Sequence, residues 1–205
     1  MLTTMVVIAK EPVPGRVKTR LTSRVSPDAA ARVAMASLLD TLDEAARVPA
    51  ERHVLLLAGR PGLWLPSGWD VVPQTDGGLD HRIATGLAKL PTGSALLVGM
   101  DTPQLTAGLL ANGMPSYDAC LGRATDGGFW ALGLSDSSLA PELVEGVPMS
   151  TDRTGAAQLE RLNDAGLRVQ HLSEIRDVDT PADADAVAAL APTTRFARAW
   201  REATA

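Results

Sequence analysis

The feature that most constrains the fold is a series of short apolar runs separated by stretches with helical spacing. The runs at residues 4–9, 53–58 and 94–99 read TMVVIA, HVLLLA and SALLVG. Strands that are apolar along their whole length are typical of parallel sheets covered on both faces. Helical patterns at 27–46 and 80–90 lie between these runs. The first half of the chain therefore predicts a β-α-β-α-β order.

The second half has a different pattern. Two runs, YDACLGRA at 117–124 and FWALGL at 129–134, flank the turn Asp126-Gly127-Gly128 and are typical of an antiparallel pair. Residues 141–150 are expected to form at most a flexible lid. Further elements are expected as strands at 70–73 and 167–172, helices at 153–165 and 181–191, and a terminal helix that packs through Phe196 and Trp200. We therefore expect a single α/β domain over residues 1–205, with a Rossmann-like, mostly parallel sheet, helices on both faces and a small antiparallel part in the second half.

Composition narrows the functional class. At 205 residues, with 45% hydrophobic and 21% charged residues, the chain is typical of a globular protein with a sizeable core. Its net charge of -5 and pI near 5.2 argue against general nucleic-acid binding, which needs broad neutralisation of phosphates. Cys120 is the only cysteine, which excludes an internal disulfide and a thiolate zinc cluster.

The start of the chain predicts no membrane association. The apolar residues 5–9 are too few for a spanning helix, and they lack the basic region and the longer apolar stretch of a signal peptide. We expect a cytoplasmic protein without a membrane partner. The oligomeric state is not readable from the sequence.

A basic loop follows the first predicted strand. Residues 9–21 read AKEPVPGRVKTRL and contain two of the three lysines of the chain. A basic loop on an acidic protein suggests one small anionic ligand, and glycine lets such a ligand approach the backbone. The alternative is a solvated surface loop stiffened by prolines, and the run matches neither a Walker A loop nor GxGxxG. The candidate phosphate-binding residues are Gly15, Arg16, Lys18 and Arg20.

An acid lies directly beyond another buried strand. Asp101 follows the run at 94–99, and ligands of open parallel sheets gather at the carboxyl ends of strands. A carboxylate in this position suits Mg²⁺ or Mn²⁺, which in turn screens a diphosphate. The alternative is that Asp101 starts a turn with Pro103, and that Thr106 caps the next helix.

A second acidic segment lies near the C-terminal end, in RDVDTPAD. Thr180 and Asp183 predict a capping box. Capping does not explain Asp177 and Asp179, which lie two residues apart in an extended segment and therefore on the same side of the chain. Two acidic sites and one basic loop suit a metal-bound nucleotide.

Five ordered motifs carry a resemblance to a known family. They are PVPGRVKTRL, GMDTPQL, ATDGGFWALGL, MSTD and RDVDTPAD, spread over residues 9–185. Together they resemble the bacterial family called radical-SAM/selenodomain-associated transferase, often named glycosyltransferase. That family belongs to the nucleotide-diphospho-sugar transferase superfamily, which has the GT-A fold. The first and last motifs are also similar to those of guanylyltransferases that activate phospholactate or phosphoenolpyruvate.

The resemblance implies a role for each matching position. Gly15, Arg16 and Lys18 would hold nucleotide phosphates, and Asp101 would bind the divalent metal, with Asp177 or Asp179 completing its coordination. Lys18 and Asp101 are therefore the candidate catalytic residues. Gly127 and Gly128 would let the substrate approach the backbone.

Two departures from the family pattern concern the metal. The family commonly has D-S-P-D-L where this chain has Asp101-Thr102-Pro103-Gln104-Leu105, so Gln104 replaces an acid. No DxD triplet is present at this strand end.

Other candidates have simpler explanations. Gln74, in QTDGGLDHR, resembles a family loop that faces the nucleotide base or the acceptor, but a turn with a helix cap also explains this stretch. His81 is expected to be a surface histidine. Ser150-Thr151-Asp152 offers a helix cap, with substrate contact by Thr151 and Asp152 as the alternative. The four tryptophans are too scattered for a stacking platform.

Three functions are compatible with these features. The first is nucleotidylyl transfer from a nucleoside triphosphate to a small anionic acceptor. The second is glycosyl transfer from a nucleotide sugar to a small-molecule acceptor. The third is a nucleotide-binding module without turnover, which Gln104 and the absent DxD triplet make admissible.

Overall fold

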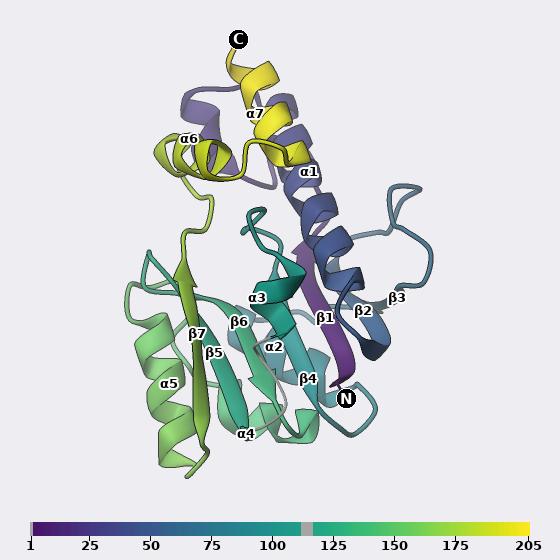
Figure 1. Cartoon of the computed structure of the whole chain (residues 1–205), viewed down its shortest axis with the longest axis vertical. Coiled ribbons are helices and arrows are strands. Elements are labelled where there is room, and N and C mark those ends of the chain that lie inside the picture. The colour runs from purple at the N-terminus through teal and green to yellow at the C-terminus, as the bar shows by residue number, and fades with distance from the viewer. Residues whose placement is uncertain (1, 112–116) are drawn as a thin grey trace.

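The structure is a computed structural model that describes residues 2–111 and 117–205. Its strands are β1 (Leu2–Lys10), β2 (Ala50–Ala58), β3 (Asp70–Pro73), β4 (Ala95–Gly99), β5 (Ala119–Ala124), β6 (Phe129–Leu134) and β7 (Val169–Ile175). They form one seven-stranded sheet in the order β3-β2-β1-β4-β6-β5-β7 (Figure 1). In this sheet β6 runs antiparallel to both of its neighbours, and the other strand pairs are parallel. The expected mostly parallel sheet with a small antiparallel part is confirmed.

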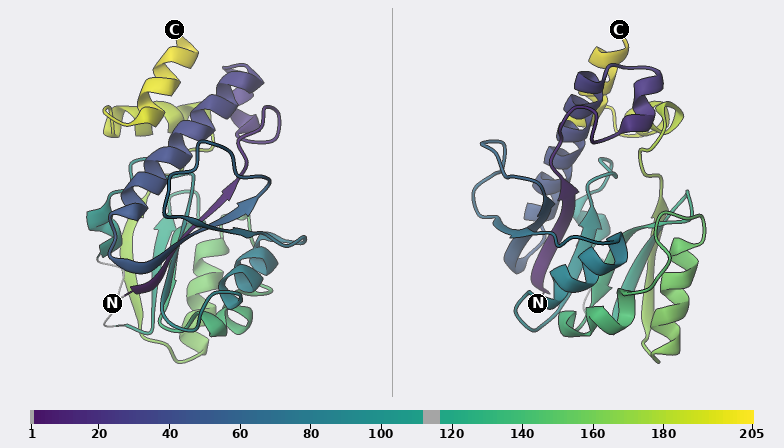
Figure 2. Two further views of the ribbon diagram at one scale, coloured as in Figure 1. Left: turned by 90° about the vertical axis from the view of Figure 1, so that its right-hand side faces the viewer. Right: turned by 180° about the vertical axis from the view of Figure 1, so that it is seen from behind.

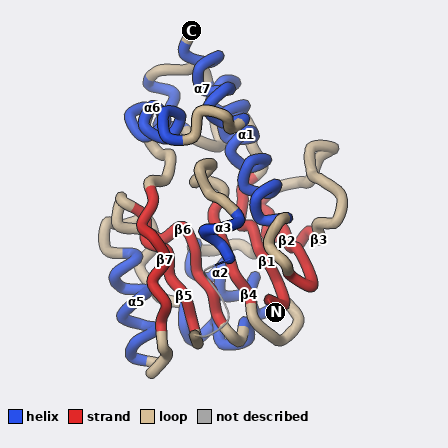
Figure 3. Tube along the Cα trace, in the orientation of Figure 1, coloured by secondary structure: helices blue, strands red, loops and turns tan. Residues whose placement is uncertain are grey.

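Helices cover both faces of the sheet. They are η1 (Thr19–Ser23), α1 (Pro27–Ala46), α2 (Leu79–Ala88), α3 (Ala107–Ala111), η2 (Ser137–Leu139), α4 (Ala140–Val144), α5 (Thr154–Asp164), α6 (Pro181–Leu190) and α7 (Arg195–Thr204). One face packs against α1 and α3, and the other against α2, α4 and α5 (Figure 2). Beyond the carboxyl ends of the parallel strands, α6 and α7 pack against α1 and η1 (Figure 3).

Local capping signals fix the start of two long helices. The Ser26 hydroxyl accepts a hydrogen bond from the Ala29 N–H at 3.2 Å, directly before the first residue of α1. At α6, Thr180 and Asp183 form the reciprocal capping box. Each such cap stabilises a helix by about 1 kcal/mol. Both predicted helix starts are confirmed.

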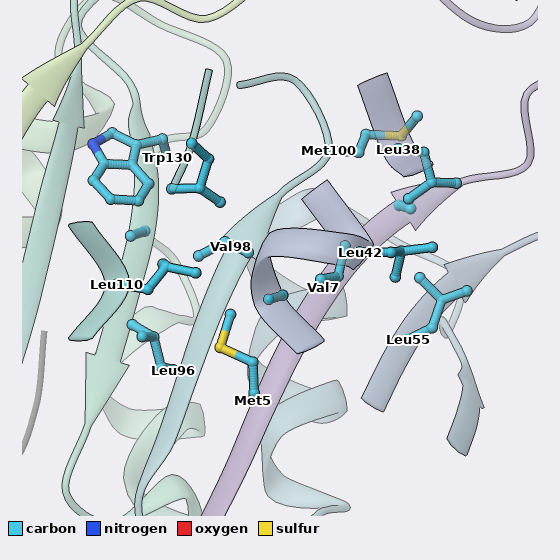
Figure 4. Packing of buried hydrophobic residues seen from close by; sticks show 14 of the residues in the cluster. Met5, Val7, Leu38, Leu42, Leu55, Leu96, Val98, Met100, Leu110 and Trp130 are labelled. Atoms are coloured by element: carbon cyan, nitrogen blue, oxygen red, sulfur yellow. The ribbon is translucent and has the colours of Figure 1, made fainter. Parts of the chain in front are cut away.

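The larger core layer fills the space between the sheet and α1 (Figure 4). Met5 and Val7 of β1 meet Leu38 and Leu42 of α1, and all four side chains are fully buried. Truncating one of these leucines to alanine would cost about 2–5 kcal/mol, because the neighbours fill the cavity only in part.

A separate apolar cluster attaches α6 and α7 to the region after β1. Its fully or almost fully buried members include Leu21, Val178, Phe196 and Trp200. Leu21 ends the basic loop, and Val178 lies between the two acids of the D-V-D segment. The cluster therefore holds these two distant segments side by side.

Two sequence expectations need correction. Residues 141–150 are not merely a lid, because Pro141 lies in the first turn of α4 and the side chains of Leu143 and Val144 are buried against the sheet. The last strand is β7 at Val169–Ile175 rather than 167–172, since it pairs in register with β5 as far as Ile175. None of the described helices combines the length and the apolar character needed to cross a membrane.

Candidate functional site

Three segments singled out from the sequence meet at the carboxyl ends of the parallel strands. Lys18 follows β1, Asp101 follows β4, and the D-V-D segment follows β7. Two other strands, β6 and β5, separate β4 from β7 in the sheet. The backbone closes this distance, because the Val178 N–H donates to the Asp101 carbonyl oxygen at 2.9 Å. The basic loop and both acidic segments therefore belong to one site.

Lys18 lies at the centre of this site. Its Nζ is 2.6 Å from Asp101 Oδ1 and also donates a hydrogen bond to the Val178 carbonyl oxygen. The Lys18 side chain is only 7% exposed, whereas that of Asp101 is 49% exposed. The backbone of Lys18 has a left-handed conformation, with φ 47° and ψ 39°, which is uncommon for a residue with a Cβ. Buried Val17 and Leu21 anchor the chain on either side.

The other candidate phosphate-binding residues of the basic loop are open to solvent. Gly15 has φ +75°, and no atom of the chain would touch a Cβ built there. Arg16 is exposed. Arg20 forms an ion pair with Asp179, with side chains that are 71% and 39% exposed. The loop thus combines one buried cation, Lys18, with an exposed rim.

The pKa of Asp177 is raised by burial and by the charges of other carboxylates. Burial is the main reason that the pKa of this carboxyl lies above its ordinary value. The Asp126 carboxylate raises this pKa further, as does Asp101 more weakly, while Lys18 acts in the opposite direction. A bound cation would relieve this repulsion between carboxylates.

Two of the three predicted metal-binding acids, together with one carbonyl oxygen, offer oxygen ligands that suit a hard divalent cation. Asp101 Oδ1 and the Val178 carbonyl oxygen both contact one cationic group, the ammonium of Lys18. Oxygen donors of this kind are the ligands that Mg²⁺ and Mn²⁺ prefer. Lys18 and Asp101 both act electrostatically on Asp177, whereas Asp179 is engaged by Arg20. Within residues 2–111 and 117–205, no three carboxylate, imidazole or thiolate groups converge as a ready-made metal site.

Gln104 has a structural role at the position where the resembled family has an acid. Its side-chain N–H₂ group donates to the carbonyl oxygen of Arg176, the residue before Asp177. This bond joins the segment after β4 to the end of β7. A carboxylate has no N–H and could not make it.

Gln74 lies at the same edge of the sheet but is largely used by the fold. Its Nε2 donates to the carbonyl oxygens of Ala9 and Leu56, at 2.8 and 2.9 Å, and so ties the ends of β1 and β2 together. Only its amide oxygen remains for a ligand. In the first turn of α2, His81 Nδ1 lies 2.8 Å from Glu145 Oε1 on the surface.

The DGG turn packs against the segment before α5. The N–H of Gly155 donates to the Gly127 carbonyl oxygen at 2.8 Å, and a Cβ on Gly155 would lie 2.5 Å from the Gly128 oxygen. The small size of these glycines thus serves a contact within the chain. This contact places the exposed Thr151 and Asp152 beside the turn.

The prediction that Ser150-Thr151-Asp152 caps the next helix is wrong. Arg153 occupies the N-cap position of α5, and no side chain caps that helix. The Thr151 hydroxyl instead accepts from the Arg153 N–H at 3.2 Å, within a turn that starts at Ser150 with φ 60°.

Two contributors to the candidate site escaped the sequence analysis. Asp126 was explained there as a turn residue, which it is, since its Oδ1 accepts from the Gly128 N–H at 2.7 Å. Val178 contributes through its backbone, which no side-chain pattern reveals. Burial raises the pKa of the Cys120 thiol to about 12, which makes this cysteine inert as a nucleophile.

Solved structures with the same fold are known. A protein from Desulfovibrio desulfuricans G20, provisionally named a nucleotide-diphospho-sugar transferase, is 25% identical with a TM-score of 0.88, over 98% of this chain and 95% of that chain. Rv0371c of Mycobacterium tuberculosis H37Rv, in complex with manganese, is 20% identical with a TM-score of 0.55, over 91% and 98%. The 2-C-methyl-D-erythritol 4-phosphate cytidylyltransferase of Thermus thermophilus is 16% identical with a TM-score of 0.58, over 94% and 100%.

These similarities identify the fold as that of nucleotide-diphospho-sugar transferases and cytidylyltransferases. No curated protein matches the sequence. The family model described as an uncharacterized protein conserved in bacteria, DUF2064, matches residues 27–151, which is more than half of the chain, and the protein therefore belongs to the DUF2064 family.

Proposed function

We propose that the protein is a metal-dependent transferase that moves a nucleotidyl group from a nucleoside triphosphate to a small anionic acceptor. The observation that carries this proposal is the contact between Lys18 and Asp101, which joins the basic loop to a candidate metal-binding acid. The fold shared with a cytidylyltransferase supports it. The resemblance of the first and last motifs to guanylyltransferases supports it as well.

In the proposed reaction, an oxygen of the acceptor attacks the α-phosphorus of the triphosphate. The new P–O bond forms as the bond to the bridging oxygen of the β-phosphate breaks, and pyrophosphate leaves with that electron pair. Lys18 would neutralise phosphate charge through its ammonium, while Gly15, Arg16 and Arg20 would hold the outer phosphates. Bound to Asp101 and Asp177, Mg²⁺ or Mn²⁺ would neutralise further charge on the phosphates.

The remaining site residues surround the phosphates. The free amide oxygen of Gln74 is proposed to face the nucleotide base, because the rest of that side chain is bonded to the ends of β1 and β2. The acceptor is proposed to bind near the DGG turn, where Thr151 and Asp152 are exposed. We propose that one domain carries all of these groups.

Glycosyl transfer is the second candidate. It is favoured by the provisional name of the relative from Desulfovibrio desulfuricans, whose structure superposes with a TM-score of 0.88. In that reaction the bond between the sugar and the nucleoside diphosphate breaks, and nucleoside diphosphate is released rather than pyrophosphate.

Product analysis separates the candidates. The purified protein would be incubated with Mn²⁺, each common nucleoside triphosphate or nucleotide sugar, and a panel of phosphorylated and carboxylated acceptors, and the products followed by ³¹P NMR. We expect pyrophosphate from a triphosphate, and Asp101→Asn should abolish its release. Nucleoside diphosphate from a nucleotide sugar would favour glycosyl transfer. Tight nucleotide binding without any product would indicate a binding module instead.

A further inference from the structure

The Lys18 ammonium occupies the position that a metal ion would need. It contacts one carboxylate oxygen and one carbonyl oxygen, from Asp101 and Val178, and is shielded from solvent. We infer that Lys18 acts as a resident cation of the nucleotide-free site, so that Asp101 binds a divalent ion strongly only after phosphates have drawn Lys18 away. This inference rests on the proposed function, because it assumes that Asp101 is a metal ligand.

The backbone that carries the two oxygen donors of Lys18 is held in place. The Val178 side chain is 0% exposed in the apolar cluster with Leu21 and Trp200. Its N–H donates to the Asp101 carbonyl oxygen at 2.9 Å, which ties the backbones of the two donor residues together. The backbone of this cation position is therefore held by contacts that do not involve the Lys18 ammonium.

Lys18 itself is the part that can move. Its backbone is fixed in the left-handed conformation between buried Val17 and Leu21, but the ammonium lies at the end of a flexible four-carbon chain. The exposed rim of Gly15, Arg16 and Arg20 lies on the same loop. Phosphates bound on that rim would offer the ammonium a new anionic partner without any change in the backbone.

Repulsion between Lys18 and the divalent ion then couples metal binding to nucleotide binding. With Lys18 on Asp101, a divalent ion at the same oxygen would meet a positive charge within a few ångströms, and such repulsion weakens binding strongly in a partly buried site. Once Lys18 has turned to phosphate, Asp101 and Asp177 are both free for the ion. By linkage, the nucleotide and the metal each raise the affinity for the other by the same factor.

Manganese binding in the absence of nucleotide tests this exchange. Titrations of the full chain followed by EPR of free Mn²⁺ would compare the wild type with Lys18→Gln and with Lys10→Gln. The control removes the same charge from an exposed position of the same loop. We expect Lys18→Gln to bind Mn²⁺ alone about tenfold or more tightly than the wild type, and Lys10→Gln to change the affinity less than about threefold. Adding Asp101→Asn to Lys18→Gln should remove the gain.

Equal affinities of Lys18→Gln and the wild type would overturn the inference, as would an equal gain in Lys10→Gln or a gain that survives Asp101→Asn. A second measurement needs no change at Lys18. Amine-reactive labelling with mass spectrometry should show Lys18 reacting more slowly than the exposed Lys10 and Lys89, and faster in Asp101→Asn. Equal labelling of Lys18 in both proteins contradicts the pairing.

Failure of the proposed function would have a different signature. In that case the manganese and labelling results hold, while no nucleoside triphosphate binds and no pyrophosphate forms. If neither the wild type nor any variant binds Mn²⁺, with or without a nucleoside triphosphate, both the inference and the metal-dependent function are overturned.

Discussion

A Cβ atom on Gly127 would lie 2.0 Å from the carbonyl oxygen of Asp152, far inside van der Waals contact. The turn after β5 and the segment before α5 are therefore fitted together at this glycine, whose φ of +93° also disfavours any residue with a side chain. This contact fixes the distance between Asp126, near the acids of the site, and the exposed Thr151 and Asp152.

Gly127→Ala should lower the free energy of unfolding by about 3 kcal/mol, because the clash is with backbone rather than with a flexible side chain. Urea denaturation measures the difference. The control is Gly15→Ala, at φ +75° with open space around its Cβ, which should cost only about 1 kcal/mol of backbone strain. Equal losses in the two variants would show that the contact between the two loops contributes nothing.

The pairing of Arg24 and Trp200 attaches the segment after the basic loop to α7. The Arg24 guanidinium lies 5.5 Å from the centre of the Trp200 ring, and both residues bond to Asp185, at 2.6 and 2.8 Å. Trp200→Phe should cost about 1 kcal/mol through one lost hydrogen bond. Trp200→Ala should cost about 3–5 kcal/mol through the cavity it leaves. Equilibrium unfolding that shows no difference between the two variants would contradict this packing.

The capping box of α6 predicts a pH-dependent contribution to stability. Burial acts to raise the pKa of Asp183, but hydrogen bonds from Thr180 and the charge of Arg176 outweigh it and leave the pKa below its ordinary value. A lowered pKa stabilises the fold at neutral pH, and this contribution is lost as the pH falls through the folded-state pKa. Asp183→Ala should therefore cost about 1 kcal/mol at neutral pH and progressively less below about pH 4. Urea unfolding across this range is the measurement, and a loss that does not vary with pH would argue against the charged cap.

Substitutions at Gln104 test whether an acid at this position would strengthen metal binding. Gln104→Asp removes the donor to the Arg176 carbonyl oxygen and should lower the free energy of unfolding by about 1–2 kcal/mol. Since the side chain is directed to that carbonyl, Mn²⁺ affinity should stay within about threefold of the wild type. Gln104→Glu, which also lacks the N–H but keeps the length, is the matched control for the lost bond. A tenfold gain in metal affinity in Gln104→Asp alone would assign this position to the metal site instead.

Local signals predicted most of the fold. The apolar runs and capping residues are read within a few neighbours, and α1 begins and ends where its helical pattern does. The position of β6 between β4 and β5 depends on pairing between residues far apart in the sequence, which the pattern of each run does not encode. The helix α4 was missed because its five residues are too short to show a period.

The candidate site could be predicted only as a set of charges. Strand ends identified Lys18 and Asp101, but their contact depends on the loop conformation around Val17 and Leu21. Asp177 and Asp179 are equivalent in the sequence, and only the neighbours contributed by other strands and loops distinguish them. The charge of Asp126 acts on Asp177, whereas Arg20 forms an ion pair with Asp179.

The most direct test of the proposed site is a crystal structure with a non-hydrolysable nucleoside triphosphate and Mn²⁺, using the base that gives the largest thermal stabilisation of the protein. We expect the triphosphate on the loop from Gly15 to Arg20, the Lys18 ammonium on a phosphate oxygen, and an anomalous manganese peak on Asp101. A triphosphate bound away from this loop, with Lys18 still on Asp101 and no manganese there, would contradict the proposed site.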